Sequence, residues 1–180
     1  YLTHYRLADD IIEWSKKNPH IKLDCFWDHA EHKKTFHYSD SLTFHPIDAE
    51  NYLSKMKSCA GLISTAGFES VAEVMYLGKP AMMVPVPNHI EQMINAFDGE
   101  LSGAGIAARE FNLDIFNNYL PHYSPVREQY RAWVSQSPNK MQEHLRSILS
   151  KEKKRHPFKN ILKGIQRFRN GRMPLPNSMS

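Results

Sequence analysis

The sequence predicts an α/β fold in which a Rossmann-like parallel sheet carries helices on both faces. Strand and helix patterns alternate over most of the 180-residue chain, as in a parallel sheet built from βαβ units. Several of the strand patterns are short apolar runs bounded by Gly or Pro, which is typical of strands buried on both faces. The chain is long enough to bury one compact core. We expect residues 1–150 to form this domain and residues 151–180 to form a tail.

The first half of the domain begins with a helix rather than a strand. Residues 7–14 place apolar side chains at helical spacing, and residues 21–27 then alternate like a strand. After a His-rich connection, "LTFHPI" is expected to be a strand, and Asp48 is placed to cap the next helix. Because no strand pattern precedes the first helix, we expect the first strand of the sheet to be missing from this stretch of sequence.

The second half repeats the strand-helix unit. "AGLIS" and "AMMV" are expected strands, and the helix between them, "FESVAEVMYL", ends at Gly78. "IEQMINAFDGELSGAG" follows as a helix before the short strand "IAA". The apolar side chains of that helix lie on one face: Ile90, Met93, Ile94 and Phe97. Two further helices, separated at Pro138, are expected after the sheet.

The turn "STAG" has the composition of a ligand site. In an open parallel sheet, ligands bind beyond the carboxyl ends of the strands, where helix N-termini present unpaired N–H groups. Gly67 would let a diphosphate approach the backbone, and Ser70 would add a hydroxyl. Glu73 lies one helical turn beyond Ser70, where its carboxylate can accept two hydrogen bonds from the vicinal diol of a ribose. The other stripe of this helix is expected to face the core: Phe68, Val71, Ala72 and Met75.

The same residues also have a purely structural interpretation. Ser and Glu near the start of a helix are common capping residues, and glycine is a common turn residue. The next strand-helix unit favours a binding site, because Glu91 and Gln92 also open a helix just after a strand end. Two polar clusters on one sheet edge would form a cleft.

The stretch "STAGFESVAEVMYLGKPAMMVPVPNHIEQMINAFDGELSGAGI" resembles the donor-binding region of GT-B glycosyltransferases. The shared pattern is a glycine, a hydroxyl three residues later, a glutamate three beyond that, then "GKP", an acidic-Gln pair and "NA". It is most similar to the peptidoglycan N-acetylglucosaminyltransferase and UDP-glycosyltransferase families. The resemblance implies the C-terminal half of a GT-B fold. This chain has Phe68-Glu69 where the plant members have Trp-Asn.

The resemblance implies a binding role for five residues. Gly67 and Ser70 would contact the donor diphosphate. Glu73 would hold the ribose hydroxyls, which agrees with the argument from its position on the helix. Glu91 and Gln92 would contact the donor sugar.

The resemblance also implies a reaction, which is an inverting, metal-independent sugar transfer from a nucleoside-diphosphate sugar, expected to be a UDP-sugar. The acceptor would be a hydroxyl of a saccharide, a lipid-linked saccharide or a small molecule, and no cofactor or metal would be required. The general base and the acceptor domain are expected outside these residues, so that this chain alone would bind donor without turning it over. Asn95 would serve helix packing, and backbone near residues 44–47 would bind the base.

Two other functions stay open. The chain could be the donor-binding subunit of a split transferase or a non-catalytic nucleotide-sugar-binding module. A sugar-nucleotide 2-epimerase shares the fold, but "STAGFESVAE" does not reproduce the "DSGG" and paired-glutamate pattern of that class.

The positive charge of the chain is concentrated in residues 151–180. Nine Lys or Arg against one Glu give this tail +8, which leaves 14 basic and 18 acidic residues, or −4, for residues 1–150. Nucleic acid is therefore not an expected partner of the domain. Apolar residues recur at helical spacing in the tail: Phe158, Ile161, Leu162, Ile165 and Phe168. Packing on an N-terminal domain, attraction to an anionic membrane surface, and disorder are the alternatives for it.

The remaining polar clusters indicate no other chemistry. His29, His32, His37 and His45 lack the spacing of a zinc site, so we expect surface or loop histidines. The serines lie in no GxSxG elbow, which argues against a hydrolase. With two cysteines, no secretory pattern and no apolar run of membrane-spanning length, we expect a cytoplasmic protein, with the basic tail as the part that would touch the inner face of the membrane.

Overall fold

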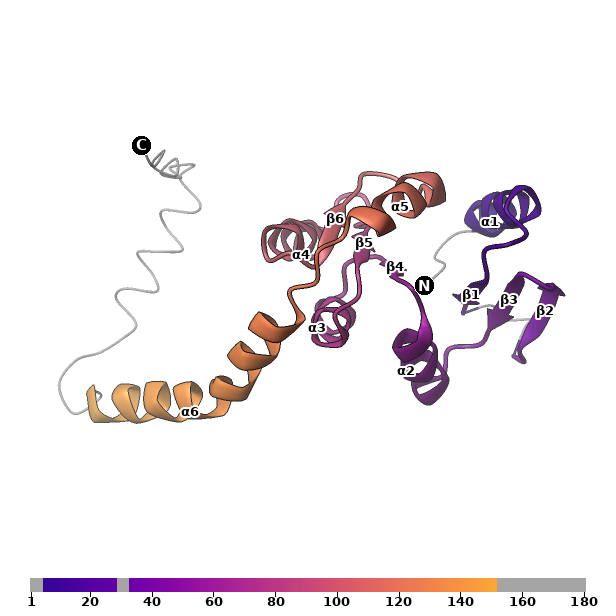
Figure 1. The fold of residues 1–180 in the computed structure, drawn as a ribbon. Helices are drawn as coiled ribbons and strands as arrows, with labels where there is room; N and C mark the ends of the chain where they lie inside the picture. Colours follow the sequence, from indigo (N-terminus) through magenta and orange to yellow (C-terminus); the bar gives the residue numbers. More distant parts are fainter. Residues whose placement is uncertain (1–4, 29–32, 152–180) are drawn as a thin grey trace, which may run out of the picture. The chain divides into compact units, whose positions relative to one another are not determined.

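The computed structural model describes residues 5–28 and 33–151 and has the α/β fold that the sequence predicts (Figure 1). The chain divides into two compact units, residues 1–132 and 133–180, and the description below concerns the first. The predicted basic tail lies outside the described residues, apart from its first residue, so its role stays a prediction.

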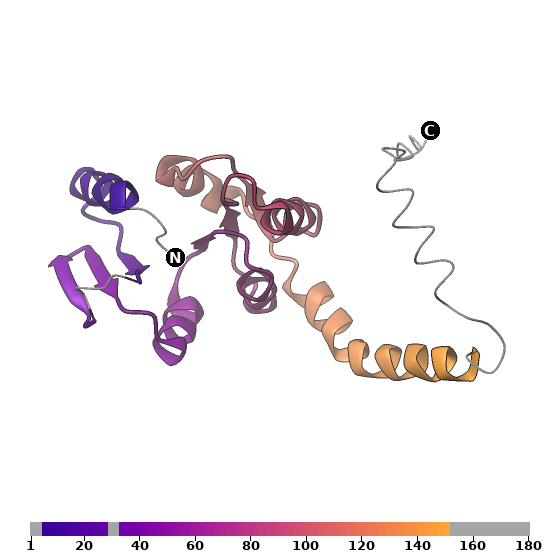
Figure 2. The ribbon, with the colours of Figure 1, turned by 180° about the vertical axis from the view of Figure 1, so that it is seen from behind.

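The first sheet of this unit has three strands in the order β1-β3-β2. β1 (Leu23–Phe26) runs parallel to β3 (Leu42–His45), and β2 (Phe36–Ser39) runs antiparallel to β3. Helix α1 (Tyr5–Lys17) lies along one face of this sheet (Figures 1 and 2). A cluster of buried residues joins the helix to the sheet: Ala8, Ile11, Leu42 and Phe44.

Strand β2 was not expected from the sequence, which predicts a His-rich connection in its place. All four of its residues are exposed, so no buried face marks the segment as a strand. What makes it a strand is its pairing with β3 across the turn at Asp40 and Ser41. β2 is an edge strand, and polar edge strands have weak sequence patterns because one side of their ladder faces solvent.

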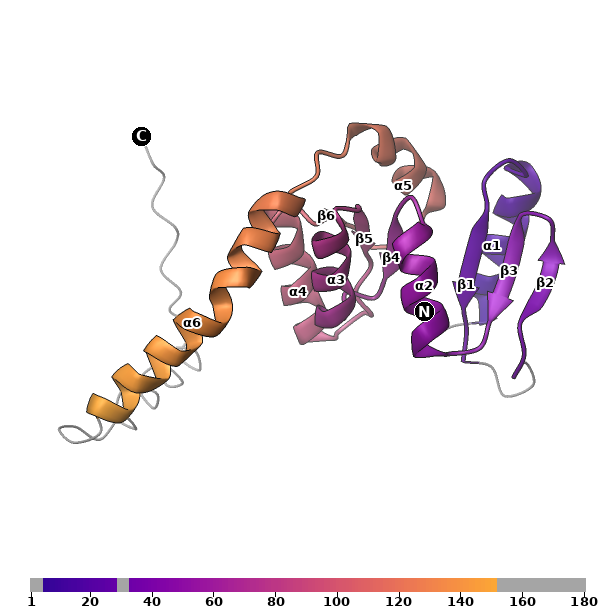
Figure 3. The ribbon, with the colours of Figure 1, turned by 60° about the horizontal axis from the view of Figure 1, so that its bottom comes forward.

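The second sheet is entirely parallel, with strand order β4-β5-β6. Its strands are short, at three residues each: β4 (Leu62–Ser64), β5 (Ala81–Met83) and β6 (Gly105–Ala107). The helices around this sheet are α2 (Ala49–Ser58), α3 (Phe68–Leu77), α4 (Ile90–Leu101) and α5 (Leu113–Tyr119), which runs into a short 3-10 turn (Leu120–His122). Helices α3 and α4 lie on one face and α5 lies on the other, which confirms the prediction of helices on both faces (Figures 1 and 3).

The core of the second sheet is built on small and flexible apolar residues. Ala81, Met82 and Met83 of the central strand are fully buried. Gly99 of α4 packs so closely on this strand that an added Cβ would lie 2.5 Å from the sulfur of Met83. α4 therefore turns its Gly99 face to the sheet. Its predicted apolar stripe, made of Ile90, Met93, Ile94 and Phe97, is exposed instead, and so is Leu101.

The single sheet expected from the sequence is observed as two. Among the described residues, β1 and β4 each pair with a neighbour on one side only. In the Rossmann strand order 3-2-1-4-5-6, the first strand joins the two halves of the sheet. Among residues 5–28 and 33–151, no strand pairs with both β1 and β4, so the two ladders stay separate.

Local helix signals are confirmed, with one exception. Asp48 caps α2, since its carboxylate accepts a hydrogen bond from the backbone N–H of Asn51 at 2.7 Å, and Gly78 ends α3 in the left-handed conformation. The exception is α6 (Arg127–Lys151), which continues through Pro138 as one helix where the sequence predicts two. A proline within a helix removes one backbone hydrogen bond, and a long helix can retain the bonds on either side.

None of the helices in the described part of the chain has both the length and the apolar character needed to cross a membrane.

Candidate functional site

The loop after β4 is held in a strained conformation at the carboxyl edge of the second sheet. Ala66 has a positive φ of 62° and is fully buried. Such a conformation costs a non-glycine residue about 1 kcal/mol or more and persists only where its surroundings enforce it. Two hydrogen bonds do so. The backbone N–H of Ala66 donates to Ser64 Oγ at 3.3 Å, and its carbonyl accepts from Asn95 Nδ2 at 3.2 Å.

Gly67 follows as the N-cap of α3 and is open to solvent. A Cβ added at this position would meet no protein atom within 4 Å. The glycine is therefore not required by packing within the chain. It leaves the first N–H groups of a ten-residue helix accessible from outside, which is the arrangement that binds anions at helix N-termini.

Ser70 and Glu73 lie one turn apart on α3, as predicted. Ser70 is half-buried, and its Oγ accepts a hydrogen bond from the hydroxyl of Tyr52 on α2 at 3.2 Å. Glu73 is exposed. Burial raises the pKa of Tyr52, opposed by its hydrogen bond to Ser70 and reinforced by the charge of Glu73. Tyr52 thus remains a protonated donor at neutral pH.

The loop after β5 places Glu91 and Gln92 at the start of α4. Glu91 is exposed, whereas the Gln92 Oε1 accepts a hydrogen bond from the backbone N–H of Val86 at 2.8 Å. The Gln92 oxygen therefore fixes the loop, and its amide nitrogen is the group that remains for a ligand. His89 caps this helix through its Nδ1, which accepts from the backbone N–H of Gln92 at 3.3 Å. Asn88, just before the cap, has a positive φ of 66°.

The two loops are connected, because Asn95 reaches from α4 to the carbonyl of Ala66. The five predicted site residues therefore lie at the starts of two helices, α3 and α4, that follow neighbouring strands of a parallel sheet. The sequence assigns Asn95 only to helix packing, and it does not identify Tyr52. Tyr52 has the spacing of a core residue, and no local pattern reveals that its hydroxyl meets Ser70.

Phe68 corrects the predicted core stripe of α3. Val71 and Met75 are buried as expected, but Phe68 is 69% exposed. It is the first residue of the helix, beyond the end of the strand that its neighbours cover. A large apolar side chain therefore stands beside the open backbone of Gly67.

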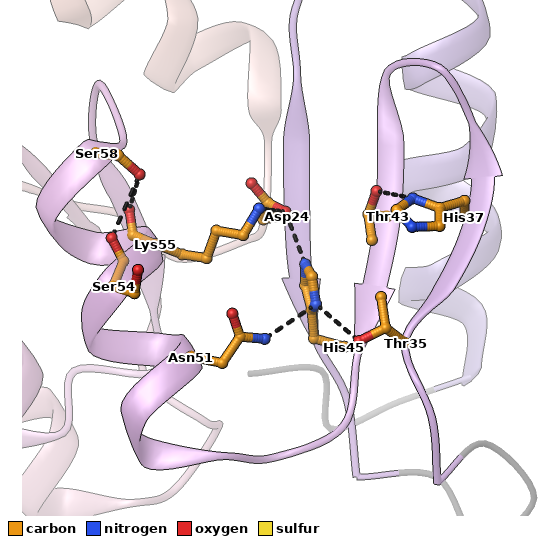
Figure 4. A network of polar contacts seen from close by, with 9 residues as sticks. All are labelled: Asp24, Thr35, His37, Thr43, His45, Asn51, Ser54, Lys55 and Ser58. Atoms are coloured by element: carbon orange, nitrogen blue, oxygen red, sulfur yellow. Dashed lines mark hydrogen bonds and ion pairs between the residues drawn. The ribbon is translucent and has the colours of Figure 1, made fainter.

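A second polar cluster lies at the end of the first sheet and is centred on His45 (Figure 4). Its Nε2 is 2.7 Å from Asp24 Oδ1, and its Nδ1 is 3.1 Å from Asn51 Nδ2 and 3.3 Å from the Thr35 hydroxyl oxygen. Lys55 contacts the same Asp24 oxygen at 2.8 Å. Burial acts to raise the pKa of Asp24, but the hydrogen bonds and charges of Lys55 and His45 outweigh it and lower that pKa.

His45 is buried, so the prediction of a surface or loop histidine is wrong for this residue. It is the last residue of β3, and its partners come from β1, from the chain before β2 and from α2. His37 hydrogen-bonds Thr43 at 3.1 Å on the exposed side, while His29 and His32 lie outside the described residues. No cluster of three or more His, Cys, Asp or Glu that could hold a metal ion occurs in the described ranges.

An apolar cavity of about 260 Å³ lies between α1 and the first sheet, away from both loops. Its lining is mostly aromatic and includes Trp27, Phe36, Tyr38 and Phe44. Such a lining offers few groups that could bind a phosphate or a sugar, so this cavity is not the predicted nucleotide site.

A comparison with protein-family models decides the family. The model described as Glycosyl transferase family 1 matches residues 28–123, which is more than half of the chain and includes both loops. The chain belongs to glycosyl transferase family 1. The predicted resemblance to GT-B glycosyltransferases is thereby confirmed.

Curated relatives support this assignment over the same region. The chain is 35% identical over 80 residues to a UDP-N-acetylglucosamine–N-acetylmuramyl-(pentapeptide) pyrophosphoryl-undecaprenol N-acetylglucosamine transferase of Lactobacillus helveticus (strain DPC 4571), which is 42% of this chain and 22% of that protein. It is 34% identical over 89 residues to the enzyme of the same name from Lactobacillus delbrueckii subsp. bulgaricus (strain ATCC BAA-365 / Lb-18), covering 47% of this chain and 24% of the relative. The matched region thus spans less than a quarter of each relative.

A solved structure agrees on the fold. The crystal structure of the glycotransferase of kitacinnamycin superposes with a TM-score of 0.57 over 73% of this chain and 37% of that chain. Because the identity is 14%, this likeness concerns the fold alone.

Proposed function

We propose that this chain is the nucleotide-sugar-binding domain of a glycosyltransferase whose donor is a UDP-sugar. The observation that carries the proposal is the open N-terminus of α3, where Gly67 leaves the backbone accessible and Ser70 and Glu73 stand on the first turns. Membership of glycosyl transferase family 1 makes a sugar donor the expected ligand of such a site.

The donor diphosphate would lie against the first N–H groups of α3. Gly67 allows close approach, and the Ser70 hydroxyl donates to a phosphate oxygen. Glu73, one turn further, accepts hydrogen bonds from the ribose diol. The N–H groups of α3 and the Ser70 hydroxyl are preorganised donors where negative charge develops on the leaving diphosphate, so the transfer would need no metal ion.

The donor sugar would extend from the diphosphate toward α4. Glu91 offers an exposed carboxylate, and Gln92 offers the amide nitrogen that does not hold the loop. The transfer would proceed in one displacement with inversion at the sugar carbon. The general base and the acceptor domain would come from outside these 180 residues.

The two curated relatives are named for transfer to a lipid-linked acceptor, and a lipid-linked saccharide is the acceptor class we propose here. The basic residues of the predicted tail, at +8, would then hold the enzyme at the anionic inner face of the membrane. A saccharide or small-molecule acceptor is the alternative.

Calorimetric titration of the chain with UDP, then with GDP and TDP, all in the presence of EDTA, tests the donor site. We expect saturable binding with a preference for UDP that does not change when EDTA is replaced by Mg²⁺. Binding that requires Mg²⁺ would contradict the metal-independent mechanism. A chain that binds none of the three nucleotides would contradict the proposed function.

A further inference from the structure

Tyr52 lies next to the candidate diphosphate site and belongs to α2, a helix that adjoins neither of the two loops. Its hydroxyl donates to Ser70 Oγ at 3.2 Å. Its ring is half-buried against the core of the second sheet and meets the ring of Phe26 edge-on, with 5.0 Å between the ring centroids. Phe26 in turn stacks on His45, also at 5.0 Å. Tyr52 therefore links the polar cluster of the first sheet to the site on the second.

The direction of the hydrogen bond matters for what Ser70 can do. A serine hydroxyl has one proton to donate and can accept two hydrogen bonds. Because Tyr52 donates to Ser70 Oγ, the proton of Ser70 is directed to another acceptor. A hydroxyl that accepts one hydrogen bond also becomes a somewhat stronger donor in the next.

We propose that Tyr52 is a positioning residue of the donor site, which holds Ser70 so that the serine hydroxyl donates to a phosphate oxygen of a bound nucleoside diphosphate. This inference rests on the proposed function. It adds a residue from α2 to a site that otherwise comes from the N-terminal parts of α3 and α4.

The position of α2, and with it that of Tyr52, is fixed by contacts with the first sheet. Asn51, the preceding residue, donates to His45, and Lys55, one turn later, contacts Asp24 (Figure 4). These contacts attach α2 to the ends of β1 and β3. Tyr52 extends from the same helix to α3, so the polar cluster around His45 sets the orientation of the helix that presents the hydroxyl to Ser70.

The test is Tyr52→Phe, which removes the hydroxyl and keeps the ring that packs on Phe26. We expect the Kd for UDP to rise about five- to tenfold, the usual effect of one lost hydrogen bond. The Kd for uridine, which has no phosphate, should stay unchanged. UDP is measured by calorimetry, and the weaker uridine by saturation of NMR chemical-shift changes. Tyr76→Phe is the matched control, because Tyr76 is an exposed tyrosine of α3, and it should change neither Kd.

The double variant Tyr52→Phe/Ser70→Ala separates a positioning role from a direct one. If Tyr52 acts through Ser70, the double variant binds UDP as weakly as Ser70→Ala and no weaker. If the fold losses in UDP affinity of the two single variants instead multiply in the double variant, the claim that Tyr52 acts through Ser70 is overturned.

Two further outcomes would overturn the inference. One is an unchanged UDP affinity of Tyr52→Phe in a chain whose unmodified form binds UDP, which leaves the proposed function intact. The other is an equal loss for UDP and uridine, which would assign Tyr52 a general structural role. A wild-type chain that binds no nucleotide would instead contradict the proposed function, and this inference with it.

Discussion

The two sheets of the first unit are stabilised in different ways. The first sheet ends in a polar cluster where His45, Asp24, Asn51 and Lys55 bond to one another. The second has a central strand of fully buried apolar residues, and its loops are fixed largely by backbone and amide hydrogen bonds. At the first sheet the polar groups satisfy each other. At the second, the N-terminus of α3 is left accessible, and this difference is why we propose the ligand site at the second sheet.

The largest effect on stability is expected at Gly105, where the second sheet has no space for a side chain. Gly105 in β6 has a φ of 155°, and a Cβ there would lie 1.8 Å from the carbonyl oxygen of Ala81. Gly105→Ala should lower the free energy of unfolding by more than about 4 kcal/mol, because a clash between the added Cβ and the backbone of Ala81 cannot be relieved by moving a side chain. Urea unfolding monitored by circular dichroism measures it.

Gly67→Ala is the matched control for that variant. Its Cβ would meet no protein atom within 4 Å, so stability should change by less than about 1 kcal/mol. The UDP affinity should nevertheless fall, because the methyl group occupies the space that we assign to the diphosphate. A Gly105→Ala chain as stable as Gly67→Ala would contradict the tight packing of the second sheet.

A smaller effect is expected at the ribose position. Glu73→Ala should weaken UDP binding by about 1.5–3 kcal/mol, the usual contribution of a hydrogen bond to a charged group, and should leave the fold intact. Calorimetry gives the affinity. Glu69→Ala removes an exposed carboxylate from the first turn of the same helix and serves as the control for charge. Equal affinities of Glu73→Ala and the unmodified chain would refute the ribose assignment.

At the first sheet, the polar cluster should contribute to stability in a pH-dependent way. The pKa of Asp24 is lower in the folded chain than its ordinary value, so its contribution is present above pH 4 or so and is lost as the pH falls through the folded pKa. Because Asp24 is one-third exposed, with a side-chain exposure of 33%, we expect Asp24→Asn to cost only about 1 kcal/mol at pH 7.

That difference should be smaller in urea unfolding experiments at pH 3, because pH 3 lies below the ordinary pKa of an aspartate and the unfolded chain then takes up a proton at this position. Asp40→Asn, in the exposed turn between β2 and β3, provides a control at both values of pH. A cost for Asp24→Asn that is the same at pH 7 and pH 3 would be incompatible with a charged cluster.

The smallest effect concerns the reactivity of the two cysteines. Burial raises the pKa of the Cys25 thiol, in β1, to about 12. Cys59 follows α2, and burial raises its pKa while the charge of Lys79 opposes the shift. Since the thiolate is the reactive form, iodoacetamide at pH 8 should modify Cys59 before Cys25, as read by peptide mass spectrometry. Faster modification of Cys25 would indicate that β1 is more open than the structure shows.

Much of the second half could be predicted because its signals are local. The signals are the short apolar strands, the glycine after α3 and the polar residues that follow each strand. Each signal involves only residues that are close in sequence. They therefore indicate the strands, the helices and the sheet edge where we propose that the ligand binds, without knowledge of the rest of the fold. Asp48 was identified as a cap for the same reason, since a cap bonds to N–H groups only two or three residues away.

The sequence by itself therefore determined the α/β class, the order of elements around the "STAG" turn and the family resemblance. Tertiary structure alone decided that β2 is a strand, that His45 is buried, that Phe68 is exposed and that Tyr52 reaches Ser70. The contacts around the candidate site join residues that are distant in sequence: Tyr52 and Ser70 are 18 residues apart, and Asn95 and Ala66 are 29 apart. Such pairs leave no periodic pattern, because their contact arises only when helices and loops pack against the finished sheet.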